Sequence, residues 1–472
     1  MSNMREIIEK CGTYIAAENE SERARLRKEL DAAGIEYPDF DEIIKGLRPV
    51  RPDKVLTGWQ LSRQFQSPAL AGKYPDQPIT VYVPPDYDPA RVYGLVIMLH
   101  GGGQGAGDGG LHFYNCTGVN DLMESSGRIV CYPSAPPNTR SWSRWHLPEA
   151  ERYLMDVITE LEYFYNLDPH NVILGGTSMG GMGANHMAHR LSDRFASVFS
   201  SSSHWDLAYW HCLAGMTMWI SQGVNDAVMF RRRHGTDIEF ARAAKMRLDQ
   251  AGVPCFYREN SGGHPLLDGR PALYEWPKWS RDQRRDPFFP RVVAVTPRGL
   301  TPWSDWRRHK IPSAAYQNHT DFHDLSDAPH ARWVTIDAVG KETIMFDMMT
   351  MADCRDAVED DWNNITFNVR RKHIPGGVVD AFIRDDGVIE VTPKNVKQFT
   401  LWLHPEMGIN PDDTRIMVWG RERFHGKITC NLVTLLDSYL RRRDWGLLYP
   451  ARVTISDEKG EWETRDQLKV SV

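Results

Sequence analysis

The fold of this chain is decided by one stretch, Asn171-Val-Ile-Leu-Gly-Gly-Thr-Ser-Met-Gly-Gly-Met-Gly-Ala184. Its first residues form an apolar run of strand type, and a helical pattern opens at Met179. Between them, residues 176–180 match G-x-S-x-G, the strand–turn–helix pattern that exposes a serine hydroxyl on a strained turn. Glycines at both ends of the pentapeptide allow a close approach that side chains would block. We therefore predict that Ser178 is a nucleophile; the alternative is a glycine-rich connection without chemistry.

Short apolar runs alternate with helical patterns on both sides of this stretch. Strands that are apolar throughout, separated by helices, favour a mostly parallel sheet covered on both faces, so the predicted fold class is α/β. The expected strands are ITVYVPP (79–85), GLVIMLHGGG (94–103), RIVCYPSAPP (128–137), NVILGGTS (171–178), SVFSSSS (197–203), TMWISQGVND (217–226) and PCFYREN (254–260). The expected helices are 149–165, 179–191 and 237–251.

Different patterns flank this α/β body. Residues 5–47 are rich in helix formers and predict a helical segment that caps the main domain. From residue 291 onward strand patterns dominate, with hairpin turns at Asp385-Asp-Gly387 and Trp419-Gly420 and one helix at 432–442. We therefore predict an N-terminal helical extension (1–55), an α/β catalytic domain (56–290) and a sandwich-like antiparallel β domain (291–472).

A second glycine-rich segment, Leu99-His-Gly-Gly-Gly103, directly follows the strand expected at 94–98. Backbone N–H groups in such a loop can stabilise an oxyanion. We predict that the N–H groups of Gly102 or Gly103, together with that of Met179, form an oxyanion hole. A phosphate-binding loop is disfavoured because the segment lacks the Lys and Ser/Thr of a P-loop.

A serine nucleophile needs an acid and a histidine, in the chain order Ser, Asp or Glu, His. Asp226 lies in the turn after the strand expected at 217–221, where ligand sites collect in open α/β sheets. His264 ends the loop Asn-Ser-Gly-Gly-His that follows the next strand. We predict Asp226 as the acid and His264 as the general base. Asp237 and His234 are the rivals, but both lie at the start of a helix.

Residues 79–270 resemble the α/β-hydrolase superfamily, and within it the serine esterases of the esterase-D, feruloyl-esterase and polyhydroxybutyrate-depolymerase-like group. The resemblance is carried by VYVPPDY followed by VIMLHGGG, and by YNLDPHNVILGGTSMGGMGA around the serine. It implies an α/β-hydrolase fold with Ser178 as nucleophile, Asp226 as acid and His264 as base. The double glycine at 180–181 is also similar to peptidases of the prolyl-oligopeptidase type, which share this fold and triad.

Aromatic and histidine side chains crowd the loops that should flank the cleft. We assign candidate substrate contacts to His100, Trp142, Trp145, His204 and Trp205. Ring faces suit apolar or sugar surfaces. The alternative for each of these residues is ordinary packing, and for His204 we favour that alternative.

Composition excludes several other classes of protein. The 472 residues carry a formal charge of −6 without a long basic tract, so we expect no nucleic-acid partner. No apolar stretch is long enough for a membrane span, and the seven cysteines are scattered, which favours reduced thiols and a cytoplasmic location. His319 and His323 stand four apart but lack a third ligand, so we expect no metal.

These observations predict a serine hydrolase that cleaves carboxylic esters, of small molecules or carbohydrates, through an acyl-enzyme intermediate. No cofactor is expected, and a homo-oligomer is left open. One alternative is a peptidase or amidase that uses the same triad. Another is a non-catalytic glycan-binding protein on a hydrolase scaffold.

Overall fold

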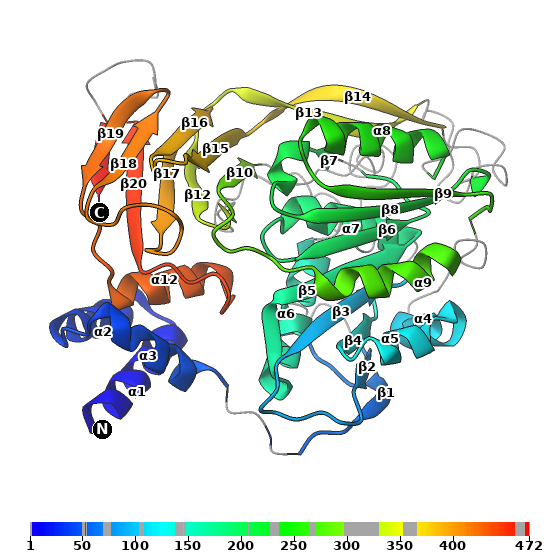
Figure 1. Ribbon diagram of the computed structural model, residues 1–472, viewed down its shortest axis with the longest axis horizontal. Coiled ribbons are helices and arrows are strands. Elements are labelled where there is room, and N and C mark those ends of the chain that lie inside the picture. The colour runs from blue at the N-terminus through cyan, green and yellow to red at the C-terminus, as the bar shows by residue number, and fades with distance from the viewer. Residues whose placement is uncertain are drawn as a thin grey trace.

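A central sheet with helices on both faces forms the larger part of the computed structural model of this protein (Figure 1). The N-terminal helices and the C-terminal sheets lie together on the side of the molecule away from β9 (Figure 1). The structure describes residues 2–49, 52, 54–68, 77–102, 108–136, 145, 148–205, 207–226, 236–264, 270–296, 330–352, 366–457 and 468–471.

The central sheet has eight strands in the order β1-β2-β4-β3-β5-β6-β8-β9. Six neighbouring strands, from β4 to β9 in this order, are parallel, whereas β2 is antiparallel to both β1 and β4. This mostly parallel sheet between helices is the α/β-hydrolase architecture, so the predicted fold is confirmed. The strands are β1 (Gly58–Arg63), β2 (Ile79–Val83), β3 (Tyr93–Leu99), β4 (Ile129–Pro133), β5 (Leu167–Thr177), β6 (Ser197–Ser201), β8 (Thr217–Gly223) and β9 (Cys255–Asn260).

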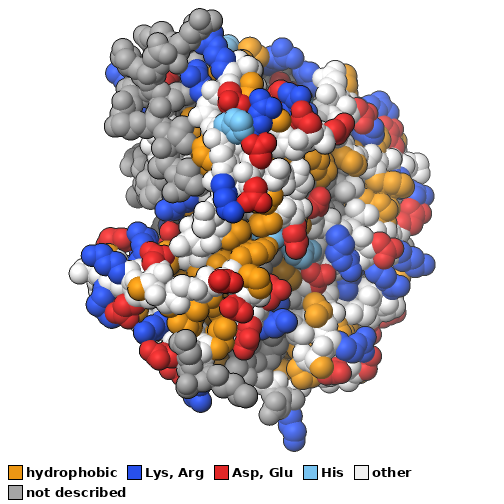
Figure 2. Space-filling model, turned by 60° about the vertical axis from the view of Figure 1, so that its left-hand side comes forward, with side chains coloured by type: hydrophobic (Ala, Val, Ile, Leu, Met, Phe, Trp, Pro, Cys, Tyr) orange, Lys and Arg blue, Asp and Glu red, His pale blue; other side chains and the backbone are white. Residues whose placement is uncertain are grey.

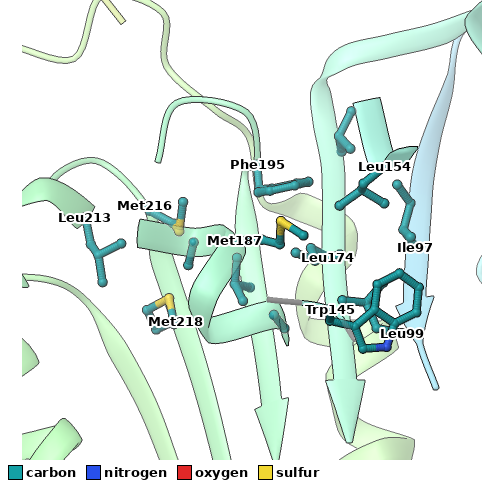
Figure 3. Close-up of a cluster of buried hydrophobic side chains, with 14 of the residues drawn as sticks. Ile97, Leu99, Trp145, Leu154, Leu174, Met187, Phe195, Leu213, Met216 and Met218 are labelled. Carbon is teal, nitrogen blue, oxygen red and sulfur yellow. The ribbon is translucent and has the colours of Figure 1, made fainter. Parts of the chain in front are cut away.

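Both faces of the sheet are buried, which explains why its strands are apolar throughout. Ile97 and Leu99 of β3 point into one hydrophobic cluster, while Val96 and Met98 point into another. Helices α6, α7 and α8 cover the first face, where Leu154 lies beside Ile97 (Figure 3). Helices α4, α5 and α9 contribute to the second. Their bounds are α4 (Gly109–Thr117), α5 (Asn120–Ser125), α6 (Pro148–Phe164), α7 (Met179–Arg190), α8 (Ile238–Gln250) and α9 (Arg270–Trp279).

All seven strands and three helices predicted for the α/β body are present. The pattern did not predict β1, whose residues GWQLSR are mixed in polarity and mostly half-buried. It also missed α9, because Pro277 lies inside that helix and prolines normally end helices.

The C-terminal part forms two five-stranded sheets, β10-β15-β16-β18-β19 and β11-β12-β17-β20-β21, which share one hydrophobic cluster. This is a mainly antiparallel sandwich, as predicted, in which β16 and β18 are paired in parallel. A third sheet, β14-β13-β7, connects this region to the α/β body. The strands are β7 (Leu207–Ala208), β10 (Arg291–Thr296), β11 (His330–Ala331), β12 (Val334–Val339), β13 (Thr343–Ala352), β14 (Thr366–Pro375), β15 (Gly377–Ile383), β16 (Ile389–Lys394), β17 (Val396–Leu403), β18 (Thr414–Val418), β19 (Arg421–Gly426), β20 (Ala451–Asp457) and β21 (Leu468–Ser471).

The N-terminal helices pack on the C-terminal helix α12 rather than on the α/β body. Ile7, Cys11 and Leu26 form a cluster with Leu432 and Leu436. The expectation of a cap on the main domain was therefore wrong, because α12 has an apolar face that these helices bury. The elements are α1 (Ser2–Ala16), α2 (Glu20–Ala32), α3 (Phe40–Leu47) and α12 (Leu432–Arg442).

Charged side chains of both signs are interspersed over the face of the molecule shown in Figure 2. Hydrophobic side chains reach the surface between them (Figure 2). Mixed charges of this kind give no single-sign field on that face. Among the described residues, no helix combines the length and the apolar character needed to cross a membrane.

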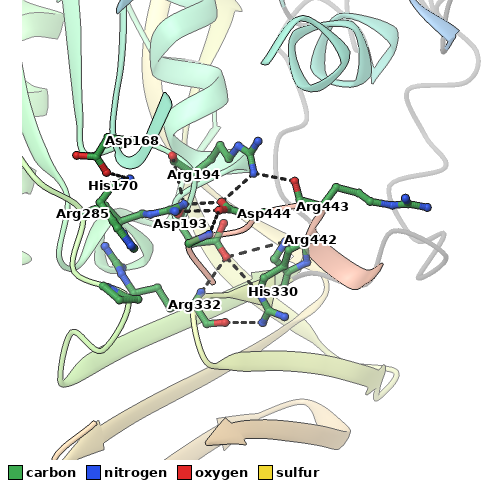
Figure 4. Close-up of polar contacts among 12 residues, drawn as sticks. Asp168, His170, Asp193, Arg194, Arg285, His330, Arg332, Arg442, Arg443 and Asp444 are labelled. Atoms are coloured by element: carbon green, nitrogen blue, oxygen red, sulfur yellow. Dashed lines mark hydrogen bonds and ion pairs between the residues drawn. The ribbon is translucent and has the colours of Figure 1, made fainter. Parts of the chain in front are cut away.

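A buried network of charges joins the α/β body to the C-terminal region (Figure 4). Arg285 is fully buried and donates from both terminal nitrogens to Asp444, at 2.6 and 2.9 Å. Arg194 contacts the same carboxylate at 2.8 Å. From the other side, Arg332 donates to the backbone carbonyl of Gly215 at 2.8 Å. These contacts link side chains and backbone of the α/β body to residues of the C-terminal region.

Glu162 borders this network, and replacing it with glutamine should stabilise the protein at alkaline pH. Burial raises the pKa of Glu162 to about 7, although Arg194 lies 3.9 Å away. Because the folded state holds the proton more tightly than the unfolded chain, stability is lost as the pH rises from about 4.5 to about 7. Glu162→Gln mimics the protonated form and should gain up to about 3 kcal/mol near pH 8, but nothing near pH 4, in urea unfolding.

The matched control for this prediction is Glu160→Gln on the same helix. Glu160 accepts a hydrogen bond from Arg63 at 2.6 Å, so its removal should not stabilise the protein at any pH. Equal stability of Glu162→Gln and the natural protein near pH 8 would contradict the prediction.

Candidate active site

Ser178 lies on a sharp turn between β5 and α7, with φ 57° and ψ −126°. Positive φ is strained for a residue other than glycine, and strain of this kind collects at functional sites. The neighbouring glycines make the turn sterically possible. A Cβ on Gly176 would lie 2.1 Å from the carbonyl oxygen of Gly180, and one on Gly180 would lie 2.0 Å from that of Leu99. The G-x-S-x-G spacing is thus required by the backbone geometry.

The three residues predicted as a triad lie within hydrogen-bonding distance of one another. The Oγ atom of Ser178 is 2.9 Å from Nε2 of His264, and Nδ1 of His264 is 2.7 Å from Oδ1 of Asp226. Each residue follows the carboxyl end of a different parallel strand, β5, β8 or β9. Asp226 is fully buried, whereas the side chain of His264 is 23% exposed. This arrangement can pass the serine proton to the imidazole while the carboxylate stabilises the resulting cation.

Two residues that the sequence did not single out hold the carboxylate of Asp226. Gln222 donates from Nε2 to Oδ2 at 2.8 Å, and the hydroxyl of Thr236 donates to Oδ1 at 2.9 Å. The Oε1 atom of Gln222 accepts from the backbone N–H of Ser203 at 3.2 Å, which orients the amide. Gln222 is visible in retrospect, since it lies at the end of β8, four residues before Asp226. Thr236 is not, because it lies ten positions after Asp226 in the sequence and no pattern connects the two.

Replacing Thr236 with valine should lower kcat for ester hydrolysis about tenfold, because a hydrogen bond to a charged group contributes about 1.5–3 kcal/mol. Valine keeps the shape but leaves Oδ1 of Asp226 with one donor fewer. Steady-state kinetics on a 4-nitrophenyl ester would measure the change. Thr236→Ser keeps the hydroxyl and should retain the natural rate, whereas an unchanged kcat in Thr236→Val would contradict the assignment.

The rivals for the acid and the base are less well placed. Asp226, and not Asp237, approaches Nδ1 of His264, while Asp237 precedes the first turn of α8. His234 lies outside the described residues.

The predicted oxyanion hole is described in part. Met179 is the first residue of α7, where a backbone N–H has no acceptor within the helix. The glycine loop lies against Ser178, since a Cβ on Gly101 would be 4.0 Å from its Oγ. Gly102 follows directly and is half-buried, whereas Gly103 lies outside the described residues.

His100, for which we expected a substrate contact, is buried and uses its ring nitrogens on backbone groups. It is 1% exposed. Its Nε2 accepts from the backbone N–H of Ala135 at 3.0 Å, so the proton is on Nδ1, which donates to the carbonyl of Gly101 at 2.8 Å. The indole of Trp145 donates to the backbone carbonyl of His100 at 3.1 Å.

The other described candidates for substrate contact are also buried. Trp145 is fully buried beneath α7, and Trp205 and His204 are 2% and 1% exposed. Burial favours packing over substrate contact for Trp145 and Trp205, and it agrees with the packing role already favoured for His204. Position in a loop does not determine side-chain direction, and large apolar rings are stabilised by burial. Trp142, and the histidines 319 and 323, lie outside the described residues.

An ion-paired cluster anchors α7 behind the nucleophile. Glu151 of α6 accepts from Arg190 at 2.6 Å and contacts His186 at 3.2 Å. Burial alone would raise the pKa of Glu151, but Arg190 and His186 lower it to about 2. The stability contributed by this carboxylate is therefore present at neutral pH and lost only as the pH falls below about 4.5.

No known protein-family profile matches this chain, and no curated protein matches its sequence. Solved structures do match. A thermostable esterase is 23% identical, with a TM-score of 0.41 over 48% of this chain and 63% of that one. A ferulic acid esterase is 20% identical, with a TM-score of 0.39 over 48% of this chain and 98% of that one. An S-formylglutathione hydrolase from Staphylococcus aureus is 14% identical, with a TM-score of 0.36 over 48% of this chain and 100% of that one. By its own sheet topology and serine turn, this chain has the α/β-hydrolase fold.

Proposed function

We propose that this protein is a serine hydrolase that cleaves carboxylic esters through a covalent acyl-enzyme. The observation that carries the proposal is the continuous hydrogen-bonded path from Ser178 through His264 to the buried Asp226. A serine is a weak nucleophile until a base within hydrogen-bonding reach removes its proton. Here the base is at that distance, and its orientation is fixed by the carboxylate.

The reaction follows from this geometry. His264 takes the proton of Ser178 as Oγ attacks the ester carbonyl, and the resulting oxyanion is stabilised by the N–H groups of Met179 and Gly102. The imidazolium then gives its proton to the leaving alcohol, and the acyl group stays on Ser178. Water, deprotonated by His264, attacks the acyl-enzyme; as the bond between the acyl carbon and Oγ breaks, His264 returns the proton to Oγ of Ser178 and the carboxylic acid is released. Besides the ester and water, these steps use side chains and backbone groups of this chain.

The proposal is confined to carboxylic esters without a specified alcohol. Trp145 and Trp205, on which the expectation of carbohydrate esters partly rested, are buried. The same triad could in principle attack amides, since the alcohol and the amine leave through the same proton transfer. The choice between ester and amide is therefore an outcome of the test.

The test compares hydrolysis of 4-nitrophenyl acetate, a longer 4-nitrophenyl ester and a peptide 4-nitroanilide by the natural protein. We expect turnover of at least one ester and little or none of the anilide. Efficient anilide cleavage would instead indicate a peptidase. A fluorophosphonate probe, mapped by peptide mass spectrometry, should label Ser178. Absence of both labelling and turnover would overturn the proposal and favour a binding protein.

A further inference from the structure

The C-terminal region contacts the α/β body close to the nucleophile, through a hairpin that leaves the sandwich. Figure 1 shows β13 and β14 extending from the C-terminal sheets along α8 toward β7. Strand β13 adds to β7, with Asp347 opposite Ala208 and Met348 opposite Leu207. The segment extended in this way begins at Ser201, the last residue of β6, and is described over residues 201–205 and 207–210. We call it the post-β6 segment.

Asp347 is the side chain through which the hairpin holds this segment. Its side chain is 10% exposed, and its Oδ2 accepts from the indole N–H of Trp210 at 3.0 Å. The same oxygen is 2.9 Å from Nε of Arg247 on α8, and Arg371 of β14 lies 3.6 Å from Oδ1. A largely buried carboxylate is costly unless its partners are well placed, and here they come from three different elements.

The other end of the post-β6 segment supports the nucleophile turn. The carbonyl of Ser201 accepts the backbone N–H of Ser178 at 2.9 Å. Asn185 of α7 donates to the carbonyl of His204 at 2.8 Å. Within the segment, the rings of Trp205 and Trp210 pack edge to face, with 5.0 Å between their centroids. A continuous series of contacts therefore runs from the C-terminal hairpin to the backbone of the nucleophile.

A second series of contacts joins Asp347 to the candidate site through α8. Arg247, the partner of Asp347, lies on this helix, and the carbonyl of Phe240 on the same helix accepts from the indole of Trp205 at 3.5 Å. Thr236, which donates to the carboxylate of Asp226, lies two residues before α8 begins. The position of α8 thus bears on both the post-β6 segment and the acid.

We propose that Asp347 is a positioning residue for the reaction proposed above, supplied by the C-terminal region. It holds the post-β6 segment and α8 in the arrangement that aligns Ser178 with His264. The proposal depends on the serine hydrolase activity. It makes the C-terminal region a working part of the catalytic unit rather than an appended binding module.

The experiment measures kcat, KM and the rate of fluorophosphonate labelling for Asp347→Ala and Trp210→Phe. Because small misplacements of a nucleophile are costly, Asp347→Ala should lower kcat and the labelling rate together by about tenfold, with KM nearly unchanged. Trp210→Phe removes the indole donor and part of the ring that packs on Trp205, but it leaves the other partners of Asp347, and it should show a smaller change in the same direction. The double variant should lose less than the product of the two single losses, since both remove one contact.

Three controls separate positioning from stability. Asp347→Asn keeps an acceptor for the indole and should recover part of the rate. Glu390 lies on the sandwich, and its carboxylate is 3.0 Å from the guanidinium of Arg384. Glu390→Ala removes this carboxylate and should leave kcat, KM and the labelling rate unchanged. The pH dependence of kcat/KM should keep its shape in every variant, because His264 and Asp226 are intact.

The outcomes are distinguishable. If the natural protein neither hydrolyses esters nor takes the label, the proposed function itself fails. If the natural protein is active and the Asp347 and Trp210 variants melt at lower temperature but keep kcat and labelling rates within about twofold, Asp347 is only structural and the inference is overturned. Should Asp347→Ala fail to fold, Trp210→Phe and Asp347→Asn carry the same test.

Discussion

Replacing Ser178 with alanine is expected to abolish ester hydrolysis, with a loss in kcat of about 10⁶-fold, the size found when the nucleophile of subtilisin is removed. The hydroxyl is the only atom of this residue that bonds to the acyl group, so no other group in the arrangement can replace it. Steady-state kinetics on 4-nitrophenyl acetate would measure the loss. The fluorophosphonate probe should no longer label the protein.

Two comparisons sharpen this prediction. Ser197→Ala removes another buried serine, at the start of β6 and away from the triad, and should keep the natural rate. The double variant Ser178→Ala/His264→Ala should be no slower than either single variant, because the residues of a triad act as one unit. A Ser178→Ala protein with near-natural kcat would refute the assignment of the nucleophile.

Replacing Asp444 with asparagine is expected to destabilise the protein by about 3–5 kcal/mol, the cost of breaking a buried ion pair from one side. In the natural protein, oxygen atoms of Asp444 lie 2.6 Å from a guanidinium nitrogen of Arg285 and 2.8 Å from one of Arg194. The change leaves both buried guanidinium groups without this carboxylate. Burial would raise the pKa of Asp444, but Arg194 and Arg285 lower it below its usual range. Equilibrium unfolding in urea near pH 7 would measure the free energy lost.

The effect of this substitution should depend on pH. Since the folded protein favours the ionised form, the stability contributed by Asp444 is present at neutral pH and is lost as the pH falls below about 3.8. Asp386→Asn is the matched control, because Asp386 pairs with Arg384 at 2.8 Å but is 52% exposed. Exposed pairs contribute about 0–1 kcal/mol. A loss below about 1 kcal/mol for Asp444→Asn would contradict the prediction.

Much of the candidate site could be predicted because each of its residues follows a strand that the sequence makes visible. The apolar runs that end near Thr177, Gly223 and Asn260 are the core strands β5, β8 and β9. In a parallel sheet all these ends lie at one edge, so residues just beyond them meet there whatever the connecting loops do. This rule predicts that Ser178 and His264 meet at that edge.

Side-chain direction in the loops could not be predicted in the same way. Trp145 and Trp205 follow visible strands too, yet both rings turn inward. His100 likewise uses both ring nitrogens on neighbouring backbone. A loop has no fixed periodicity, so its sequence does not say which side of the chain faces the core.

The sequence by itself determined where apolar runs begin and end, and where glycine alone permits a close turn. From these two features it also indicated that Ser178, Asp226 and His264 follow the ends of strands. These features depend on local backbone geometry and on the period of apolar residues, both of which are written in consecutive positions. Only the tertiary structure decided that Thr236 donates a hydrogen bond to Asp226 and that α1 packs on α12. It also decided that Asp347 accepts a hydrogen bond from Trp210. Those contacts join residues far apart in the chain, and the free energy that selects them comes from burial and pairing that no short segment contains.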